Sequence, residues 1–257
     1  MRKGLLRIAW RASSVLLVLA VWEGISRSGL VNPRLFPGLG AIGDEFVSLF
    51  TTGLIWEHLG ATLIRVAGGF SAAAIVGILL GFVMARFALF GRLFEPFFSA
   101  TYPVPRVAVY PIFVLAFGLG HLSKIALVFL ECLYPIAINT YYGTRAVDRQ
   151  LVWASQNMGA SPRQVFWKVV IPAASPHIFA GLRIALPVAL VIAVITEMIG
   201  ATEGIGYLVA YAAASLSRAQ VFAGVLVIAI VGFALDRAIT LARDRFIFWQ
   251  RPGVAIG

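Results

Sequence analysis

Several stretches of about 20 mostly apolar residues run through this sequence and constrain its fold more than any other feature. A helix of that length is what the hydrocarbon core of a bilayer requires. Of the 257 residues, 60% are hydrophobic and 12% are charged, whereas roughly a quarter of the residues of a soluble domain are charged. Because such a chain has too little polar surface to cover a water-soluble globule, the sequence predicts an all-α integral membrane protein.

About six membrane-spanning helices are expected from the apolar segments. They cover approximately residues 12–25, 59–85, 96–117, 124–142, 178–200 and 221–241. Basic residues before the first segment are also typical of a signal peptide, but no clear small-x-small cleavage site follows, so an uncleaved helix is preferred. Residues 27–58 are expected to form a loop with a short amphipathic helix near 44–50. Residues 1–257 are therefore interpreted as a single transmembrane domain.

Small residues recur every four positions along the second expected span. They are Gly69, Ala73, Gly77 and Gly81. Residues four apart lie on the same face of a helix, so this face lets another helix approach closely.

Three prolines interrupt the third expected span, namely Pro103, Pro105 and Pro111. Proline removes a backbone donor and kinks or breaks a helix. Inside a membrane such a break is tolerated where the freed carbonyls meet protein or a water-filled path. The third span is therefore expected to be broken.

The distribution of lysine and arginine predicts the orientation in the membrane. Six spans place both termini on the same side. Fourteen basic residues fall on that side: Arg2, Lys3, Arg7, Arg11, Arg86, Arg92, Arg145, Arg149, Arg163, Lys168, Arg237, Arg243, Arg245 and Arg251. Four fall on the other: Arg27, Arg34, Lys124 and Arg218. Because cytoplasmic loops carry the excess of basic residues, both termini are predicted to be cytoplasmic.

Several other functions are disfavoured by what the sequence contains. The net charge of +10 is spread between apolar segments and forms no continuous basic face, so nucleic acid is not an expected partner. The single cysteine, Cys132, excludes a disulfide framework, and the three histidines are too scattered for a metal-binding helix. No G-x-x-x-x-G-K-[ST], H-E-x-x-H or G-x-S-x-G pattern occurs, so this chain is not expected to be an enzyme or to bind a cofactor.

The longest cytoplasmic connection, from Arg145 to about His177, carries successive helix signals. Residues 151–158 are compatible with a helix, and Gly159 follows where a left-handed C-terminal cap is common. Ser161, Pro162 and Gln164 then form a helix start with a capping box. The result is two short helices joined by a rigid turn, called the elbow below.

The second elbow helix is expected to end at Pro172, and Ser175 with Pro176 is expected to start the fifth span. Apolar and aromatic residues of the elbow, Phe166 and Trp167 among them, are expected to be exposed. Such a surface in the cytoplasm favours a partner protein, although packing against the membrane bundle of this chain is an alternative.

The segment WASQNMGASPRQVFWKVVIP resembles the cytoplasmic coupling motif of binding-protein-dependent ABC importer permeases, in which Glu-Ala-Ala, three residues, Gly and nine residues precede Ile-x-Leu-Pro. Matching positions are Trp153, Ala154, Ser155, Gly159, Val169, Ile171 and Pro172. Trp153 replaces the acidic first residue, and Ile171 replaces the leucine. The resemblance implies ATPase coupling through Trp153, Ala154, Ser155, Gly159, Ala160, Ser161, Pro162, Phe166, Trp167, Ile171 and Pro172.

Three further segments resemble the taurine, nitrate and alkanesulfonate branch of that family. They are YPVPRVAVYPIFVLAFGLGHLSK, EMIGATEGIGY, and HLGATLIRVAGGF with Arg65. The resemblance covers roughly residues 58–250. It implies a permease, paired with a second copy in a homodimer, that moves a small anion or related small organic molecule. Two cytoplasmic ATPase subunits would bind the ATP and Mg, and an extracytoplasmic binding protein would deliver the substrate.

A few polar side chains fall inside or beside the expected spans and are candidates for a translocation path. They are Arg65, Tyr102, Arg106, Glu131 and Glu197. Charges within a membrane are costly, so they face the interior or one another. An ion-pair network and a substrate path both remain open for this set. A secondary carrier or channel and an intramembrane enzyme are the alternatives for the whole chain.

Overall fold

The computed structural model describes residues 2–32, 35–101 and 104–249, and within these ranges the regular elements are all helical. The predicted all-α class is confirmed. The elements are α1 (Arg2–Arg27), α2 (Leu39–Thr51), α3 (Leu54–Arg86), α4 (Ala88–Thr101), a 3-10 helix (Arg106–Val109), α5 (Tyr110–Phe117), α6 (His121–Arg145), α7 (Arg149–Asn157), α8 (Pro162–Val165), a π-helical turn (Phe166–Val170), α9 (Ile171–Gly200), α10 (Ile205–Ala214) and α11 (Arg218–Phe246).

Four helices in the described part of the chain are long and apolar enough to cross a membrane. They are Leu54–Arg86, His121–Arg145, Pro162–Gly200 and Arg218–Phe246, and they contain the second, fourth, fifth and sixth expected spans. Two shorter apolar helical segments cover Arg106–Phe117 and Ile205–Ala214. The first expected span lies within α1, and the short helix expected near 44–50 is part of α2.

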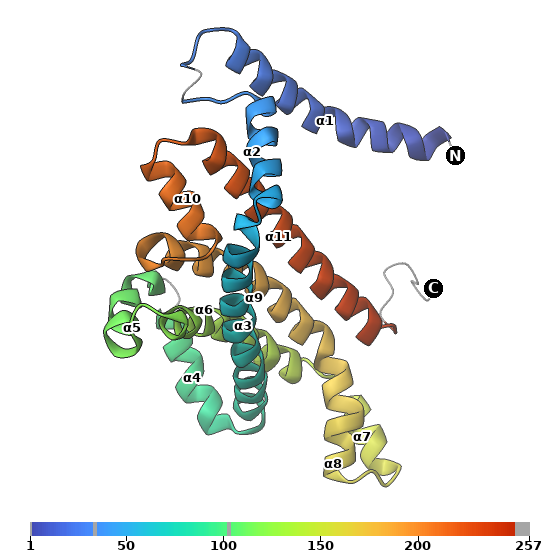
Figure 1. Ribbon diagram of the computed structural model, residues 1–257. Helices are drawn as coiled ribbons and strands as arrows, with labels where there is room; N and C mark the ends of the chain where they lie inside the picture. The colour runs from blue at the N-terminus through green and yellow to red at the C-terminus, as the bar shows by residue number, and fades with distance from the viewer. Residues whose placement is uncertain (1, 33–34, 102–103, 250–257) are drawn as a thin grey trace.

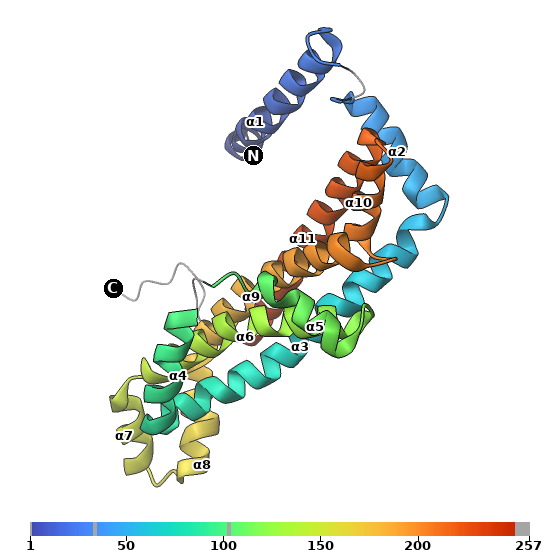
Figure 2. The same cartoon turned by 90° about the vertical axis from the view of Figure 1, so that its left-hand side faces the viewer.

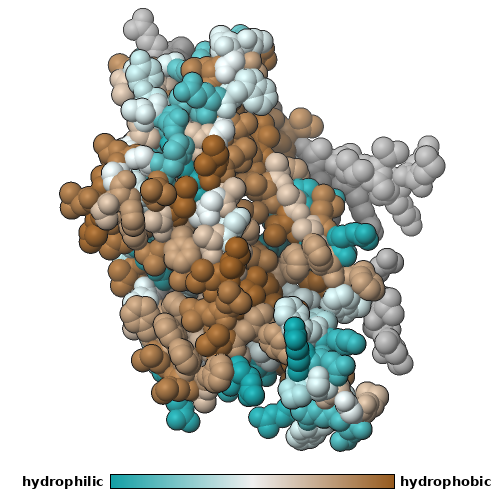
Figure 3. Space-filling view, turned by 60° about the horizontal axis from the view of Figure 1, so that its bottom comes forward, coloured by the Kyte–Doolittle hydropathy of each residue, from teal (hydrophilic) through white to brown (hydrophobic). Residues whose placement is uncertain are grey.

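The bundle is elongated, with α7 and α8 at one end and α2 and α10 at the other (Figures 1 and 2). Helix α1 extends away from the remaining helices in both views. Hydrophobic residues cover most of one face, with hydrophilic residues gathered towards its ends (Figure 3). An apolar surface between two polar ends is what a protein embedded in a bilayer requires.

The face of small residues on α3 packs against α6. A Cβ added at Gly69 would lie 2.5 Å from Val128 Cγ1, and one added at Gly81 would lie 2.5 Å from Thr140 Cβ. Those separations are shorter than real Cβ contacts, so only glycine allows this approach. The prediction of a close helix contact on this face is confirmed.

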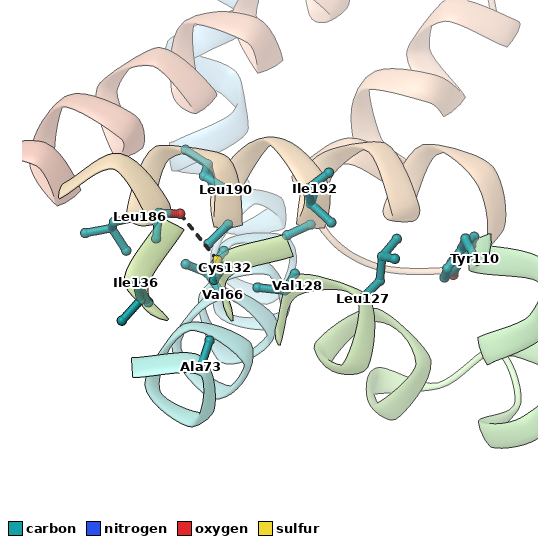
Figure 4. Close-up of a cluster of buried hydrophobic side chains, with 13 residues drawn as sticks. Val66, Ala73, Tyr110, Leu127, Val128, Cys132, Ile136, Leu186, Leu190 and Ile192 are labelled. Carbon is teal, nitrogen blue, oxygen red and sulfur yellow. Dashed lines mark hydrogen bonds between the residues drawn. The ribbon is translucent and has the colours of Figure 1, made fainter. Parts of the chain in front are cut away.

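The main core lies where α3, α6 and α9 meet (Figure 4). Val66 and Ala73 come from α3, Val128 and Cys132 from α6, and Leu190 from α9. Cys132 is fully buried, and its thiol donates to the carbonyl oxygen of Ala185 at 3.4 Å. This core fixes the three long helices against one another.

The third expected span is broken, as predicted. Helix α4 ends at Thr101, and the chain resumes as the 3-10 helix after Pro105. Pro111 lies in the first turn of α5, where its missing N–H costs nothing, so it begins a helix rather than bending one. Pro103 lies outside the described residues.

The expectation that Pro172 ends the second elbow helix is wrong. Residues 162–200 form one continuous helix through α8, the π-helical turn and α9. In the π-helical turn the Ile171 N–H bonds to the Phe166 carbonyl, five residues back. This wider turn directly before Pro172 accommodates a proline ring that would clash in a regular α-helix.

Ser175 and Pro176 do not start the fifth span either. Pro176 lacks the N–H that would bond to the carbonyl oxygen of Pro172, four residues earlier. The Ser175 hydroxyl donates to that oxygen at 2.8 Å instead. The serine thus replaces the lost hydrogen bond, and the helix continues.

Candidate functional site

The turn of the elbow has the geometry that its sequence predicts. Gly159 has φ of +84°, in the left-handed region, which glycine adopts at little cost. The Gly159 N–H donates to the Gln156 carbonyl at 2.9 Å, and the Ala160 N–H donates to the Ser155 carbonyl at 3.0 Å. These two bonds form a Schellman motif, which satisfies the last carbonyls of α7.

The next helix starts with the expected capping box. The Gln164 N–H donates to Ser161 Oγ at 3.4 Å, and the Ser161 N–H donates to Gln164 Oε1 at 2.8 Å. Pro162 takes the first helical position. The C-terminal cap of α7 and the N-terminal cap of α8 therefore follow each other within a few residues, which makes the elbow a rigid corner.

Large side chains of the elbow divide into two groups. Trp153 is 58% exposed, Trp167 60% and Met158 81%. Phe166, by contrast, is partly buried, because its ring packs edge-on against Phe82 of α3 with centroids 5.2 Å apart. The expectation of exposure was therefore wrong for Phe166, which anchors the elbow to the bundle, while both tryptophans are open to a partner.

The remaining predicted coupling residues also differ in exposure. Ser155 is buried, and its hydroxyl donates to the Val152 carbonyl at 2.8 Å. Exposed residues of the set are Ala154, Gly159, Ser161 and Pro162, and the half-buried ones are Ala160, Ile171 and Pro172. The exposed members of the predicted set thus lie in the turn and on the helices that flank it.

A buried polar cluster lies near Gly200, the end of the helix Pro162–Gly200 opposite to the elbow, and is called the Arg65 cluster. One guanidinium nitrogen of Arg65 lies 2.8 Å from Glu197 Oε1, and the other lies 2.8 Å from Glu203 Oε1. The side chains of Arg65 and Glu197 are 2% and 0% exposed. The Thr62 hydroxyl donates to Glu197 Oε2 at 2.9 Å, as does the Gly206 N–H. Both carboxylate oxygens of Glu197 are thereby hydrogen-bonded, which offsets the cost of burying its charge.

The loop between α9 and α10 closes over the Arg65 cluster. The Gly204 N–H donates to His58 Nδ1 at 3.1 Å, and the Ile205 N–H donates to the Thr62 hydroxyl at 2.9 Å. Gly204 has φ of +112°, and a Cβ there would collide with the Glu197 carboxylate. The loop can approach the ion pair this closely only because glycine occupies that position.

Two further nitrogen-bearing side chains, those of Lys124 and His121, lie beside this cluster. Lys124 is fully buried and donates to three carbonyl oxygens, those of Leu119, Gly120 and Gly200, at 2.6, 3.2 and 3.0 Å. His121 Nε2 lies 3.0 Å from Glu203 Oε1. Sequence reasoning missed Glu203, Lys124 and His121 as members. The one available signal was their position in the segments that resemble the permease branch.

Arg106 and Glu131 form a separate pair. Arg106 Nη1 lies 3.0 Å from Glu131 Oε2, both side chains are 14% exposed, and the guanidinium stands 5.5 Å from the centre of the Tyr134 ring. This pair lines a cavity of about 510 Å³ with Asn139 and Ile184. The predicted polar residues thus form two groups, and Tyr102 lies outside the described residues.

The sequence matches the family model described as binding-protein-dependent transport system inner membrane component over residues 54–247. It is 33% identical over 239 residues to the taurine transport system permease protein TauC of Escherichia coli K12, covering 91% of this chain and 87% of that protein. It is 31% identical over 252 residues to the putative aliphatic sulfonates transport permease protein SsuC of Bacillus subtilis, covering 97% and 91%. It is 32% identical to the formylaminopyrimidine transport permease protein ThiX of Halalkalibacterium halodurans, covering 92% and 94%.

Solved structures with the same fold are chains of ABC transporters. A chain of the inward-facing MetNI methionine transporter matches with a TM-score of 0.61 at 18% identity, covering 77% of this chain and 99% of that chain. A chain of an amino acid ABC transporter with histidines matches with a TM-score of 0.58 at 15% identity, covering 80% and 98%. This chain therefore belongs to the family of binding-protein-dependent transport system inner membrane components, and it is a multi-pass permease subunit of an ABC importer.

Proposed function

We propose that this permease carries a small organic anion, such as a sulfonate or a taurine-like compound, through the cytoplasmic membrane into the cell. Nitrate and related small organic molecules are the next candidates. Support comes from two relatives, a taurine transport permease and a putative aliphatic sulfonate transport permease. Membership in the family implies an ATPase and a substrate-binding protein as partners. The ATPase would bind ATP and Mg, and this chain would bind no cofactor.

In this proposal the permease works as a homodimer with two ATPase subunits, one docked on each elbow. The observation that carries it is the rigid, exposed turn around Gly159, flanked by Trp153 and Trp167. Two exposed tryptophans on a preorganised corner are the kind of surface on which interface energy concentrates. The other exposed residues of the elbow, Ala154, Ser161 and Pro162, give the ATPase a backbone surface of fixed shape.

The continuous helix Pro162–Gly200 suggests how movement at the elbow reaches the substrate path. A helix of 39 residues is about 60 Å long, enough to pass through the whole bilayer. One end begins at the elbow, and Glu197 near the other end belongs to the Arg65 cluster. A shift of the ATPase would therefore act on both sides of the membrane through a single continuous helix.

The two polar groups have different roles in the proposal. The Arg65 cluster is structural, because Arg65 and Glu197 are almost completely buried, Glu197 accepts from the Gly206 N–H, and Arg65 donates to the Glu203 carbonyl. The Arg106–Glu131 pair borders the translocation path, because it lines a cavity and keeps some exposure.

Uptake measurements test the transport proposal. A strain lacking this chain should lose ATP-dependent uptake of one compound from a panel of small sulfonates, nitrate, aromatic acids and pyrimidine precursors. Expression of the intact chain should restore it. Unchanged uptake of every compound in the panel would contradict the proposed substrate class.

The proposed orientation, with both termini and the elbow in the cytoplasm, rests on the fourteen basic residues counted on one side against four on the other. With Cys132 replaced by alanine, a cysteine at the exposed Asp44 should react with a membrane-impermeant thiol reagent in intact cells. A cysteine at the exposed Gln164 should react only after the membrane is opened. The reverse pattern of labelling would invert the topology.

A further inference from the structure

A cavity of about 830 Å³ lies between the C-terminal ends of α3 and α6 and the elbow. Its wall is apolar: Leu79, Phe82 and Val83 come from α3, and Phe166 and Val170 come from the π-helical turn. Leu79 is 60% exposed, so the wall is open towards the surroundings of the helices. A wall of this kind favours a ligand with a hydrocarbon part.

Three arginines surround the same cavity. Arg86 is the last residue of α3, Arg145 is the last residue of α6, and Arg149 is the first residue of α7. All three are exposed, and no acidic side chain of the described residues pairs with them or lines the cavity. The nearby Asp148 caps the backbone of α7 by accepting from the Gln150 N–H at 2.8 Å.

Arg145 is held in place beside the cavity. Its Nη1 donates to the Tyr141 hydroxyl at 2.8 Å, and its guanidinium lies 5.5 Å from the centre of the Tyr141 ring. That contact uses one nitrogen and leaves other donors of the planar guanidinium for a ligand. Several such donors close together match the geometry of a phosphate.

We propose that this cavity binds one anionic phospholipid, with its acyl chains against the apolar wall and its phosphate among Arg86, Arg145 and Arg149. Charge complementarity selects this occupant, because basic pockets between membrane helices bind anionic headgroups. A free phosphate would leave the wall unused, and a neutral lipid would leave three cations unpaired. The lipid touches Phe166 and Val170, so it braces the elbow against α3. The inference does not depend on which substrate is transported.

Lipid binding to the purified full-length permease tests the proposal. Native mass spectrometry with phosphatidylglycerol and phosphatidylcholine would give the affinity for each. Phosphatidylglycerol should bind about tenfold tighter or more, and the double substitution Arg86→Gln and Arg149→Gln should remove that preference. The matched control is Arg237→Gln with Arg245→Gln, which removes the same charge from α11, outside the cavity. The control should keep the preference.

Three outcomes would overturn the proposal. The first is equal affinity for the two lipids, or full retention of the preference by Arg86→Gln with Arg149→Gln. The second is displacement of phosphatidylglycerol by an equal concentration of inorganic phosphate, which would mean that the site recognises phosphate alone. The third is release of the lipid on addition of the ATPase, which would make the cavity an ATPase contact. Because both substituted arginines are exposed, the variant and the parent, both freed of lipid, should melt alike, and this comparison separates loss of binding from loss of fold.

Discussion

The two ends of the continuous helix Pro162–Gly200 are built from different kinds of contact. At the elbow the hydrogen bonds join neighbours in sequence, such as Ser161 and Gln164, three residues apart. At the other end Glu197 bonds to Arg65, 132 residues away in the chain. The elbow leaves Trp153 exposed, whereas Arg65 and Glu197 are almost completely buried.

This difference separates folding from partner binding. A buried ion pair with several long-range bonds holds helices in position relative to one another, and breaking it lowers the free energy of unfolding. An exposed turn held by local caps contributes little to the global fold and presents a fixed surface. Substitutions in the Arg65 cluster should therefore lower thermal stability, whereas substitutions in the elbow should weaken binding of the ATPase.

The largest stability loss is expected from Arg65→Met. The change leaves the Glu197 carboxylate buried without its cation, which costs about 3–5 kcal/mol. Thermal unfolding of the purified permease in detergent should show a large decrease in midpoint. Combining Arg65→Met with Glu197→Gln should recover part of the loss, because the unpaired charge is then gone. Additive losses in the double variant would contradict the ion-pair explanation.

Glu197→Gln alone should have a smaller effect of the same kind. Glu203 still pairs with Arg65, and the amide oxygen of glutamine can accept from Thr62, so a loss of about 1–3 kcal/mol is expected. Protein yield and melting temperature should fall, while the order of preference among transported compounds stays the same. A changed preference at unchanged stability would assign this residue to the substrate path instead.

Ser161→Ala should have the smallest effect. Removing an N-cap hydroxyl costs about 1 kcal/mol, here confined to the start of α8. Hydrogen exchange at the first turn of that helix should become about fivefold faster, and the global melting temperature should hardly change. Ser161→Thr, which keeps the cap, is the control. A large decrease in the global melting temperature would show that the elbow contributes to the stability of the whole fold.

Much of the elbow could be predicted from sequence because its determinants are local. Gly159 and the Ser161–Gln164 capping box act within a few residues of their own positions. The end of the helix at Pro172 was predicted wrongly for the opposite reason. The expectation that proline ends a helix assumes regular α-helical geometry. No short sequence pattern predicts the π-helical turn before Pro172, or the hydrogen bond from Ser175 that replaces the one lost at Pro176.

The Arg65 cluster could be predicted only in part. Arg65 and Glu197 are recognisable because charges inside apolar segments must find partners. Their pairing with each other, and the separate pairing of Arg106 with Glu131, depend on how α3, α6 and α9 pack. Glu203 falls outside the expected spans and Lys124 is the first residue of the fourth one. Their positions beside the cluster depend on the end of α9 and on the loop that folds back over Glu197.

Docking of the ATPase on the elbow is the central claim, and Gly159→Asp tests it most directly. Gly53→Asp at the other end of the bundle is a matched control. Both glycines are exposed, have positive φ (+84° and +80°) and have open space around an added Cβ, so both substitutions cost roughly 1 kcal/mol of local strain.

The measurement is co-purification of the ATPase with each variant, followed by ATP hydrolysis in vesicles with substrate-loaded binding protein. Gly159→Asp should insert and melt like Gly53→Asp, yet lose most of the bound ATPase and most of the stimulated hydrolysis. Gly53→Asp should retain the bound ATPase. Full docking and full stimulation in Gly159→Asp would show that the elbow is not the coupling surface.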